Sequence, residues 1–486
     1  MDEVPQAYAN EVQNSIDKLK IKYSDNRFIL SCRIAAYQSS MAGFTTVELA
    51  DFDDEQIERF IHNWFRSELD IDNNVAEACW AKLSQPEYKA SLELAQTPLL
   101  LTFLCITYDA YQDFPEQRSQ LYSEALDILL RKWDAQKRIK RDKIYANWNI
   151  NLELALLSEL AHDFFTRDEL FFTKESILEY IQVFLSDTAG NVKFIDIEAV
   201  LGAIAIQQGI LVERAADIYS FSHLTLQEYL TAKYISQDNR RIEKLIADHL
   251  TDERWQEIFL LVAGLKDDAG ELLKLMEKAT QKLTNTNKLE QLLIWAQSIA
   301  NDTSPYFNPV DTRAIAIAYA LSYNNADTKA LAYALAKVKA LANAYPLTNA
   351  YPIGNVYAYA LVNVYPLKYF IEYARWSEEF QIYRDVNYSQ LISKLEELEQ
   401  QIPNNSAGRE VRKAFALRII QTWLEAFHLK PEMVDLSKQE IAALDNYFYG
   451  NLLMVKCKNA AVRVSKETWQ NIESRMLLPV KPLANK

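Results

Sequence analysis

The chain has 486 residues, with 52 Lys and Arg against 66 Asp and Glu, which gives a formal net charge of −14. This acidic balance argues against a general nucleic-acid or anionic-membrane surface, because both attract cations. Nine glycines, where average usage would give about 34, together with 49% hydrophobic residues, predict a mostly helical globular protein with short connections. A chain of this length corresponds to roughly three or four domains.

Targeting and redox signals are absent from the sequence. No apolar run reaches the roughly 18 residues of a membrane span, and the acidic start has no apolar signal-peptide region. The four cysteines (Cys32, Cys79, Cys105 and Cys457) are isolated, which favours buried thiols in a reducing cytoplasm over disulfides or a metal site.

The first 50 residues alternate between helix and strand signals. Apolar residues from Val12 to Tyr23 recur at steps of three and four, which predicts an amphipathic helix. The run Arg27–Cys32 is typical of a short buried strand, and a second strand is expected at Thr45–Leu49.

Helical signals dominate the next part of the chain. An acidic start at Asp53 opens an amphipathic helix, and Thr97-Pro98 has the form of an N-cap followed by a first-turn proline before Leu99–Tyr108. Trp64 and Trp133 are predicted to lie in the core. Further helices are expected near 118–137, 150–166, 173–186 and 194–207. Two short β-type runs within 209–221 predict a hairpin, and Thr225 with Glu228 predicts a capping box for a helix to Ile235.

From about residue 240 the pattern is helical to the end. Residues 314–366 are rich in Ala and Tyr, with recurring Ala-Tyr-Pro pieces that indicate either stacked short helices or low-complexity sequence within a helical region. Two amphipathic helices follow Arg409, the run Asn451–Cys457 is compatible with strand or helix, and Ser465 is expected to open a terminal helix.

Catalytic and metal-binding signatures are missing. The sequence contains no Gly-x-x-x-x-Gly-Lys-Ser/Thr, Gly-x-Gly-x-x-Gly, Gly-x-Ser-x-Gly, His-Glu-x-x-His or Cys-x-x-Cys. Its five histidines are far apart, so no metal site is predicted.

Five motifs in order nevertheless resemble one family. They are Met1–Pro5 (Met-Asp-Glu-Val-Pro), Asn26–Arg33, Thr97–Cys105, Leu121–Asp134 and Tyr219–Leu230, the last containing Ser-His-Leu-Thr-Leu-Gln-Glu. In this order they resemble the NACHT branch of the STAND nucleotide-switch NTPases, relatives of the NOD-like immune receptors. The resemblance covers roughly residues 1–265, and Leu444–Pro479 is similar to the helical tail of bacterial NACHT proteins.

The resemblance implies roles for five residues. Asp2 and Glu3 would be the end of a Walker B motif that holds or polarises magnesium-bound water, or an ordinary acidic N-terminus. Arg33 would sense the terminal phosphate, or be a surface cation. The ring of Pro98 would pack on adenine as well as start a helix. His223 would bond the ADP β-phosphate, or pack at the hairpin-to-helix junction.

The implied layout is mainly α. It comprises a residual α/β part of a P-loop NTPase domain, a small helical domain, a winged-helix domain with a small hairpin, and an α-helical C-terminal region. The first three parts correspond to residues 1–50, 51–115 and 116–236. The C-terminal region divides into 237–400, with the Ala/Tyr-rich repeats, and 401–486, a C-terminal helical NACHT-associated domain. The motif at Met1 implies that the P-loop is either encoded upstream or lost.

The implied function is a switch in bacterial defence or signalling, closed with ADP and open and oligomerising with ATP. Its cofactors would be ATP or ADP with Mg in the intact family, and none for this chain if it is a nucleotide-independent helical scaffold, the rival interpretation. Without a P-loop, no ATP hydrolysis is expected from this chain alone. Expected partners are proteins, a second copy or a P-loop-containing segment, in the cytoplasm, without nucleic acid or membrane.

Overall fold

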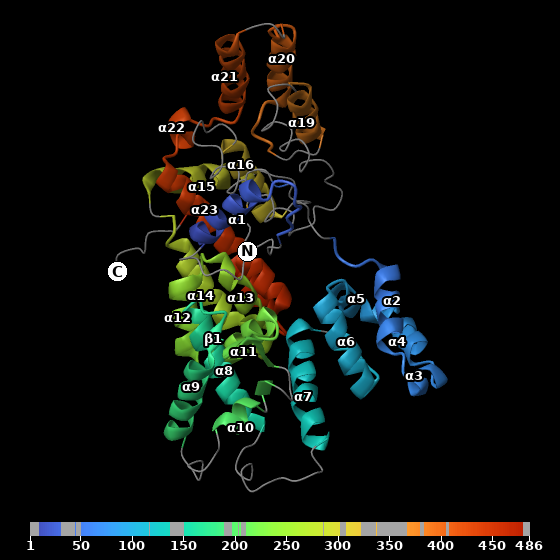
Figure 1. Cartoon of the computed structure of the whole chain (residues 1–486). Coiled ribbons are helices and arrows are strands. Elements are labelled where there is room, and N and C mark those ends of the chain that lie inside the picture. The colour runs from blue at the N-terminus through green and yellow to red at the C-terminus, as the bar shows by residue number, and fades with distance from the viewer. Residues whose placement is uncertain are drawn as a thin grey trace. The chain divides into compact units, whose positions relative to one another are not determined.

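The fold is known from a computed structural model. It describes residues 9–30, 44, 50–115, 117–136, 150–188, 197–202, 204–205, 210–284, 286–301, 308–321, 337, 367–379, 383–404 and 408–479. The chain forms two compact units (Figure 1). Unit 1 is mainly Met1–Leu245 with Asp252–Ala269, and unit 2 is mainly Gly270–Asn459 with Arg463–Lys486.

The N-terminal helix α1 spans Ala9–Lys22 and confirms the predicted amphipathic helix. The strand predicted at Arg27–Cys32 is wrong for residues 27–30, which have no regular secondary structure. Ile29 is 95% exposed there, because the described part of the chain offers no strand to pair with this apolar run. The second predicted strand, near 45–49, lies outside the described residues.

A bundle of short helices follows in unit 1. Its members are α2 (Asp54–Trp64), α3 (Glu68–Asp72), α4 (Val75–Leu83), the 3₁₀ turn η3 (Pro86–Tyr88), α5 (Lys89–Ala95) and α6 (Pro98–Tyr111). Asp53 caps α2 in a capping box with Gln56, which confirms the predicted start. Trp64 is 41% exposed rather than core, because it ends α2 and stacks on Phe60 of the same helix.

The bundle contains two of the cysteines, and both are free and buried as predicted. Burial raises the pKa of the Cys79 and Cys105 thiols. Cys457, in unit 2, is also free and buried, whereas Cys32 lies outside the described residues.

A three-stranded sheet with helices forms the second part of unit 1. The elements are α7 (Arg118–Gln136), α8 (Ile150–Thr166), β1 (Phe172–Thr173), α9 (Lys174–Asp187), α10 (Ile197–Gly202), β2 (Leu211–Ala215), β3 (Ile218–Phe221), α11 (Leu224–Ser236), η6 (Glu253–Trp255) and α13 (Gln256–Leu265). The sheet is antiparallel in the order β1-β3-β2. The predicted hairpin is confirmed, with Asp217 in the left-handed region (φ 58°) at its turn.

Helix α11 is the centre of this second part. It packs against α8 on one side and α13 on another, and most of its residues are buried. The aromatic core around it includes Phe165 and Trp255, whose rings meet edge to face at 4.9 Å. A helix buried on several sides has its ends fixed by its neighbours, which makes its N-terminus a rigid position.

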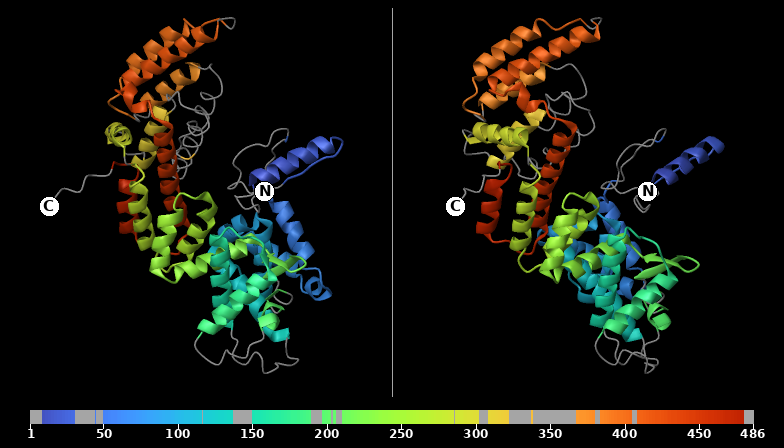
Figure 2. Two further views of the ribbon diagram at one scale, coloured as in Figure 1. Left: turned by 60° about the vertical axis from the view of Figure 1, so that its left-hand side comes forward. Right: turned by 90° about the vertical axis from the view of Figure 1, so that its left-hand side faces the viewer.

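The regular secondary structure of unit 2 is all helical in its described residues. Its helices are α14 (Gly270–Gln281), α15 (Asn287–Asn301), α16 (Pro309–Leu321), α19 (Leu367–Glu379), α20 (Tyr388–Glu399), α21 (Arg409–Ala426), α22 (Pro431–Val434), α23 (Lys438–Ala460) and α24 (Lys466–Arg475), and α12 (Asn239–His249) links the two units. Helices α19, α20 and α21 lie side by side (Figure 2). The run Asn451–Cys457 is helical, and Ser465 caps α24 as predicted. Most of the Ala/Tyr-rich segment lies outside the described residues.

Candidate functional site

His223 lies at the junction between β3 and α11, where the sequence placed it. Its backbone is extended (φ −142°, ψ 139°), and it is the N-cap residue of α11. The ring Nδ1 accepts a hydrogen bond from the Thr225 backbone N–H at 3.2 Å. The predicted capping box at Thr225 is therefore wrong, because the helix begins two residues earlier than that pattern requires and the histidine ring performs the capping.

Two groups of Thr225 lie against Nδ1 of His223, the backbone N–H and the side-chain hydroxyl. With Nδ1 as the acceptor of the N–H, a neutral ring carries its proton on Nε2. His223 is exposed, so this N–H donor lies at the surface, at the positive end of the α11 dipole. Donor and dipole together suit an anionic ligand.

Arg214 is fixed next to this junction. Its Nε donates to the Ser220 hydroxyl at 2.9 Å, and a terminal nitrogen donates to the Ser222 carbonyl oxygen at 3.0 Å. These two bonds hold an exposed guanidinium on the strand end that leads into His223. Sequence reasoning missed Arg214, because only the β2–β3 pairing brings it beside the junction.

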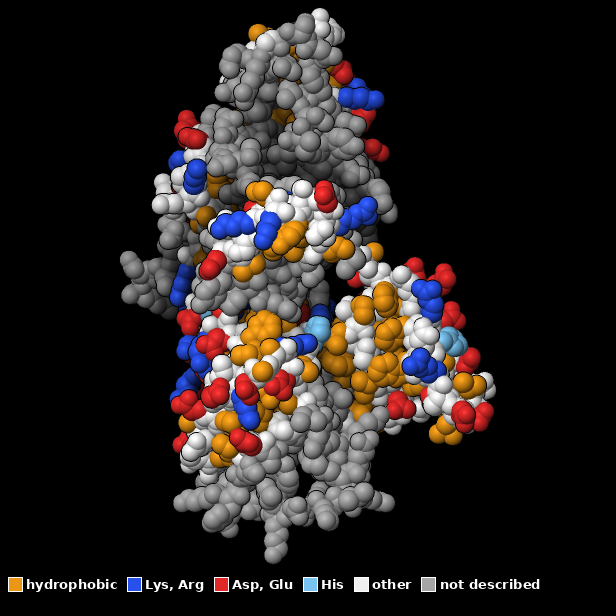
Figure 3. Space-filling view, viewed as in Figure 1, with side chains coloured by type: hydrophobic (Ala, Val, Ile, Leu, Met, Phe, Trp, Pro, Cys, Tyr) orange, Lys and Arg blue, Asp and Glu red, His pale blue; other side chains and the backbone are white. Residues whose placement is uncertain are grey.

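Pro98 is the first residue of α6, as predicted. It is exposed, Thr97 is the N-cap residue, and the Thr97 side chain makes no capping hydrogen bond. Hydrophobic side chains gather on the surface over α5 and α6 (Figure 3), where Leu94, Leu99 and Ile106 are half-buried. Pro98 thus lies at the edge of an apolar face of the bundle.

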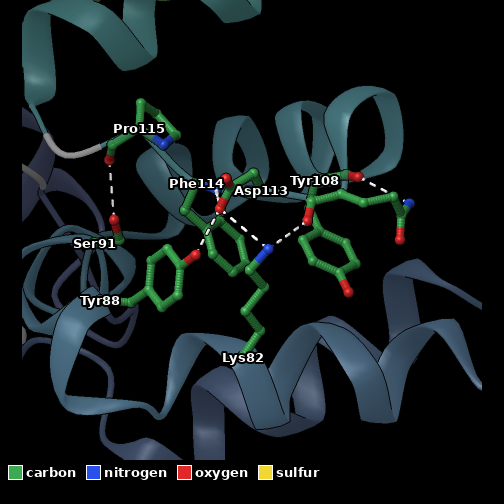
Figure 4. Close-up of polar contacts among 8 residues, drawn as sticks. Lys82, Tyr88, Ser91, Tyr108, Asp113, Phe114 and Pro115 are labelled. Carbon is green, nitrogen blue, oxygen red and sulfur yellow. Dashed lines mark hydrogen bonds and ion pairs between the residues drawn. The ribbon is translucent and has the colours of Figure 1, made fainter.

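A polar cluster fastens the segment that joins α6 to α7 (Figure 4). The Asp113 carboxylate accepts from the Tyr88 hydroxyl at 2.7 Å and from the Phe114 N–H at 2.9 Å, and it lies 3.2 Å from the Lys82 ammonium. Lys82 also donates to the Gln112 carbonyl oxygen at 2.7 Å. These contacts hold the pKa of Asp113 below its ordinary value, the Tyr88 bond being the main cause.

A buried polar group lies where α7 meets α13. The Arg118 guanidinium pairs with the Glu257 carboxylate, with Nε and Oε1 3.3 Å apart. Burial raises the pKa of neighbouring Tyr122 to about 12, although Arg118 opposes that rise. Despite burial, the charges of Glu257, Tyr122 and Glu228 raise the pKa of Arg118. The pairing atoms Nε and Oε1 are buried, whereas the Arg118 side chain as a whole is 39% exposed, so the ion pair lies at the edge of the core. Sequence reasoning did not identify it.

The structure brings part of the predicted site into one unit. Pro98 and His223 both lie at helix N-termini of unit 1, and both are exposed. Asp2, Glu3 and Arg33 lie outside the described residues, so a convergence of Arg33 with the other two stays a prediction. Among the residues that the structure describes, no group of three or more His, Cys, Asp or Glu side chains is arranged to hold a metal ion. Nor is any helix in that part of the chain both long and apolar enough to cross a bilayer.

Comparison with protein-family models gives two matches. Residues 118–235 match the winged helix-turn-helix domain C-terminal to NACHT. Residues 391–479 match the NACHT C-terminal helical domain 2. A search of curated proteins finds no match. The first matched range includes α7, the β2–β3 hairpin and nearly all of α11. Arg214 and His223 both lie within it.

Proposed function

We propose, on the premise that this chain is a NACHT-type protein, that it is the regulatory part of a nucleotide-dependent signalling switch. ADP would hold the closed state through the winged-helix domain, and exchange for ATP would open the chain for self-association. Such a switch requires contacts that differ between the two nucleotides. The observation that supports the proposal is the fixed, exposed ring of His223 at the N-terminus of α11.

The chemistry at this junction suits a phosphate. The Nε2–H of His223 would donate to a phosphate oxygen, the α11 dipole favours the negative charge, and the Arg214 guanidinium adds a second cation. Pro98 would contribute an apolar contact for the base. Asp2, Glu3 and Arg33 would complete the site, with Mg²⁺ supplied alongside the nucleotide.

A titration of the full chain with fluorescent ADP tests this role. His223→Ser keeps an N-cap side chain but cannot reach a ligand, and we expect it to weaken ADP binding about tenfold to a hundredfold. Arg214→Gln should weaken binding less, and Arg240→Gln, at a residue 89% exposed in its side chain on α12, serves as the matched charge control. Adenosine, which lacks phosphate, should be insensitive to His223→Ser.

The rival function is a nucleotide-independent helical scaffold for protein partners. It is favoured by the absence of any Gly-x-x-x-x-Gly-Lys-Ser/Thr motif from the 486 residues. The absence of any ADP-dependent signal at millimolar nucleotide would favour this rival, whereas equal ADP binding by wild type and His223→Ser would refute only the role of His223.

Hydrolysis and biological role are separate parts of the proposal. Without a P-loop lysine and backbone cradle, the chain alone should turn over ATP no faster than buffer, and magnesium-dependent turnover lost in Glu3→Gln would contradict this. The defence role would appear as reduced phage plating on bacteria that express the protein. That protection should be lost with His223→Ser.

A further inference from the structure

Three aromatic rings connect α6 to α11 through α7. The Phe103 ring of α6 meets the Tyr122 ring of α7 edge to face, with centroids 5.5 Å apart and planes at 79°. The opposite neighbour of Tyr122 is Tyr229 of α11, stacked at 5.5 Å and 21°. All three side chains are buried, at 4%, 0% and 0% exposure. Tyr122 is thus one residue of α7 whose ring touches both helices.

The orientation of Tyr122 is fixed from more than one side. The Arg118 guanidinium lies 6.0 Å from the centre of its ring and is paired with Glu257 of α13. One turn before Tyr122, the Ser119 hydroxyl donates to the Gly264 carbonyl oxygen of α13 at 2.9 Å. Helix α7 therefore cannot rotate about its axis without breaking buried polar contacts, and the Tyr122 ring is held between its two partners.

The two outer rings lie close to the two candidate ligand positions. Phe103 follows Pro98 by five residues and Tyr229 follows His223 by six, so each ring is about 7–9 Å along its helix from the candidate residue. A helix of this length is stiff. A change in the spacing of the rings on either side of Tyr122 would therefore be transmitted along both helices and would change the distance between Pro98 and His223.

We propose that Tyr122 is a positioning residue that sets the separation of the α6 and α11 N-termini, and thereby the affinity of the site between Pro98 and His223 for a nucleoside diphosphate. The predicted effect of Tyr122 on nucleotide affinity rests on the proposed function. The separation of the two helices does not, since it follows from the packing of Phe103, Tyr122 and Tyr229.

Two substitutions separate the ring from its hydroxyl. The Tyr122 hydroxyl has no hydrogen bond of normal geometry within the described part of the chain, and its polar neighbour is the Arg118 guanidinium. Tyr122→Phe removes that interaction, keeps the stacked ring and serves as the conservative variant. Tyr122→Leu removes the ring. Phe427→Leu is the matched control, because Phe427 is as buried as Phe103 but belongs to unit 2, where its ring meets those of Tyr383 and Trp423.

The first readout is a distance that needs no ligand. Spin labels at Ala110→Cys on α6 and Gln237→Cys after α11, both exposed positions, report the separation of the two helices by pulsed electron resonance. A Cys32→Ser background leaves three buried cysteines. We expect Tyr122→Leu to shift or broaden the distance distribution, while Tyr122→Phe and Phe427→Leu leave it unchanged.

The second readout is ADP affinity of the same full-length proteins. We expect Tyr122→Leu to weaken binding on the order of tenfold and the other two variants to stay within about twofold. If Tyr122→Leu does not fold, Phe103→Leu tests the same contact from the other side. Equal effects of Tyr122→Leu and Phe427→Leu, or none from Tyr122→Leu, would overturn the proposal.

The two readouts also separate the two claims. If wild type binds no ADP, the proposed function and the predicted effect of Tyr122 on affinity are both wrong. The distance measurement still decides whether Tyr122 positions α6 and α11. If ADP binds and His223→Ser weakens it, but Tyr122→Leu changes neither readout, only the positioning role is refuted.

Discussion

Ser119 at the start of α7 donates its hydroxyl proton to the carbonyl oxygen of Gly264 near the end of α13, at 2.9 Å and across 145 residues of sequence. The contact depends on the missing side chain of the glycine. A Cβ on Gly264 would lie 2.7 Å from the Ser119 oxygen and 2.9 Å from the Ala460 carbonyl oxygen, both too close for real atoms. Close approach of α7 and α13 therefore requires glycine at position 264.

Gly264→Ala should destabilise unit 1. The added methyl group must push α7 away or break the Ser119 bond, which we expect to cost about 1–3 kcal/mol of unfolding free energy. Urea unfolding followed by circular dichroism measures it. Gly202→Ala is the matched control, since a Cβ there meets nothing within 4 Å and alanine favours a helix. Equal stability of both variants would contradict the close-packing argument.

The His223 cap should contribute measurably to the stability of α11. Removing it with His223→Ala leaves the Thr225 N–H without its acceptor, and we expect a loss of about 1 kcal/mol. His223→Ser should recover most of that loss, because a serine oxygen caps the same N–H. Thermal unfolding of the three proteins in parallel gives the comparison. If His223→Ser is no more stable than His223→Ala, the ring packs at the junction without capping the helix.

The sequence predicted helix positions well where the residues that start a helix lie close together in the chain. The start of α2 depends on the capping box of Asp53 and the start of α6 on the first-turn proline Pro98, both signals lie within a few residues, and both starts are confirmed. The strand at residues 27–30 was wrong, because an apolar run becomes a strand only where another strand pairs with it.

The candidate site was predicted only in part, for a related reason. His223 could be recognised from its motif, but its role as the cap of α11 depends on where β3 ends, which β2 pairing fixes. Arg214 and the Phe103–Tyr122–Tyr229 contacts involve residues far apart in sequence. No local signal predicts which buried aromatic rings will meet.

Asp113 should stabilise the bundle in a pH-dependent way. Its pKa is depressed in the folded state, chiefly by the Tyr88 hydroxyl, so its contribution is present above the unfolded pKa and is lost as pH falls through the folded one. We expect the unfolding free energy of wild type to exceed that of Asp113→Asn by less than about 1 kcal/mol at pH 5–7, because the carboxylate is 60% exposed and screened.

The stability of the two proteins at low pH checks this prediction for Asp113. The difference between wild type and Asp113→Asn should shrink as pH falls below about 4, the ordinary pKa of an aspartate, and disappear once the folded carboxyl is also protonated. Glu55→Gln removes the same charge from an exposed position of the same bundle and controls for net charge. An Asp113→Asn difference that stays constant from pH 7 to pH 3 would mean that the carboxylate charge does not contribute.

Asp311 should have the opposite pH dependence in unit 2. This residue lies in the first turn of α16 at 1% exposure, and its Oδ1 has no hydrogen-bond partner among the described residues. Burial raises the pKa of its carboxyl to about 8, and the charge of Glu473 on α24 adds to the rise. The folded protein therefore keeps Asp311 protonated at pH 7, whereas the unfolded chain releases that proton.

For a raised pKa the stabilising contribution is complete below the unfolded value near 4 and is lost as pH rises to about 8. Asp311→Asn keeps the size of the side chain and removes its titration. We expect the variant to gain stability over wild type by up to about 1.4 kcal/mol per pH unit across this range, then to level off. Urea unfolding monitored by tryptophan fluorescence of unit 2 measures the gain. Glu473→Gln should give a smaller gain of the same sign, since it removes the lesser cause, and an Asp311→Asn protein less stable than wild type at pH 8 would show that the ionised carboxylate is stabilised in the fold.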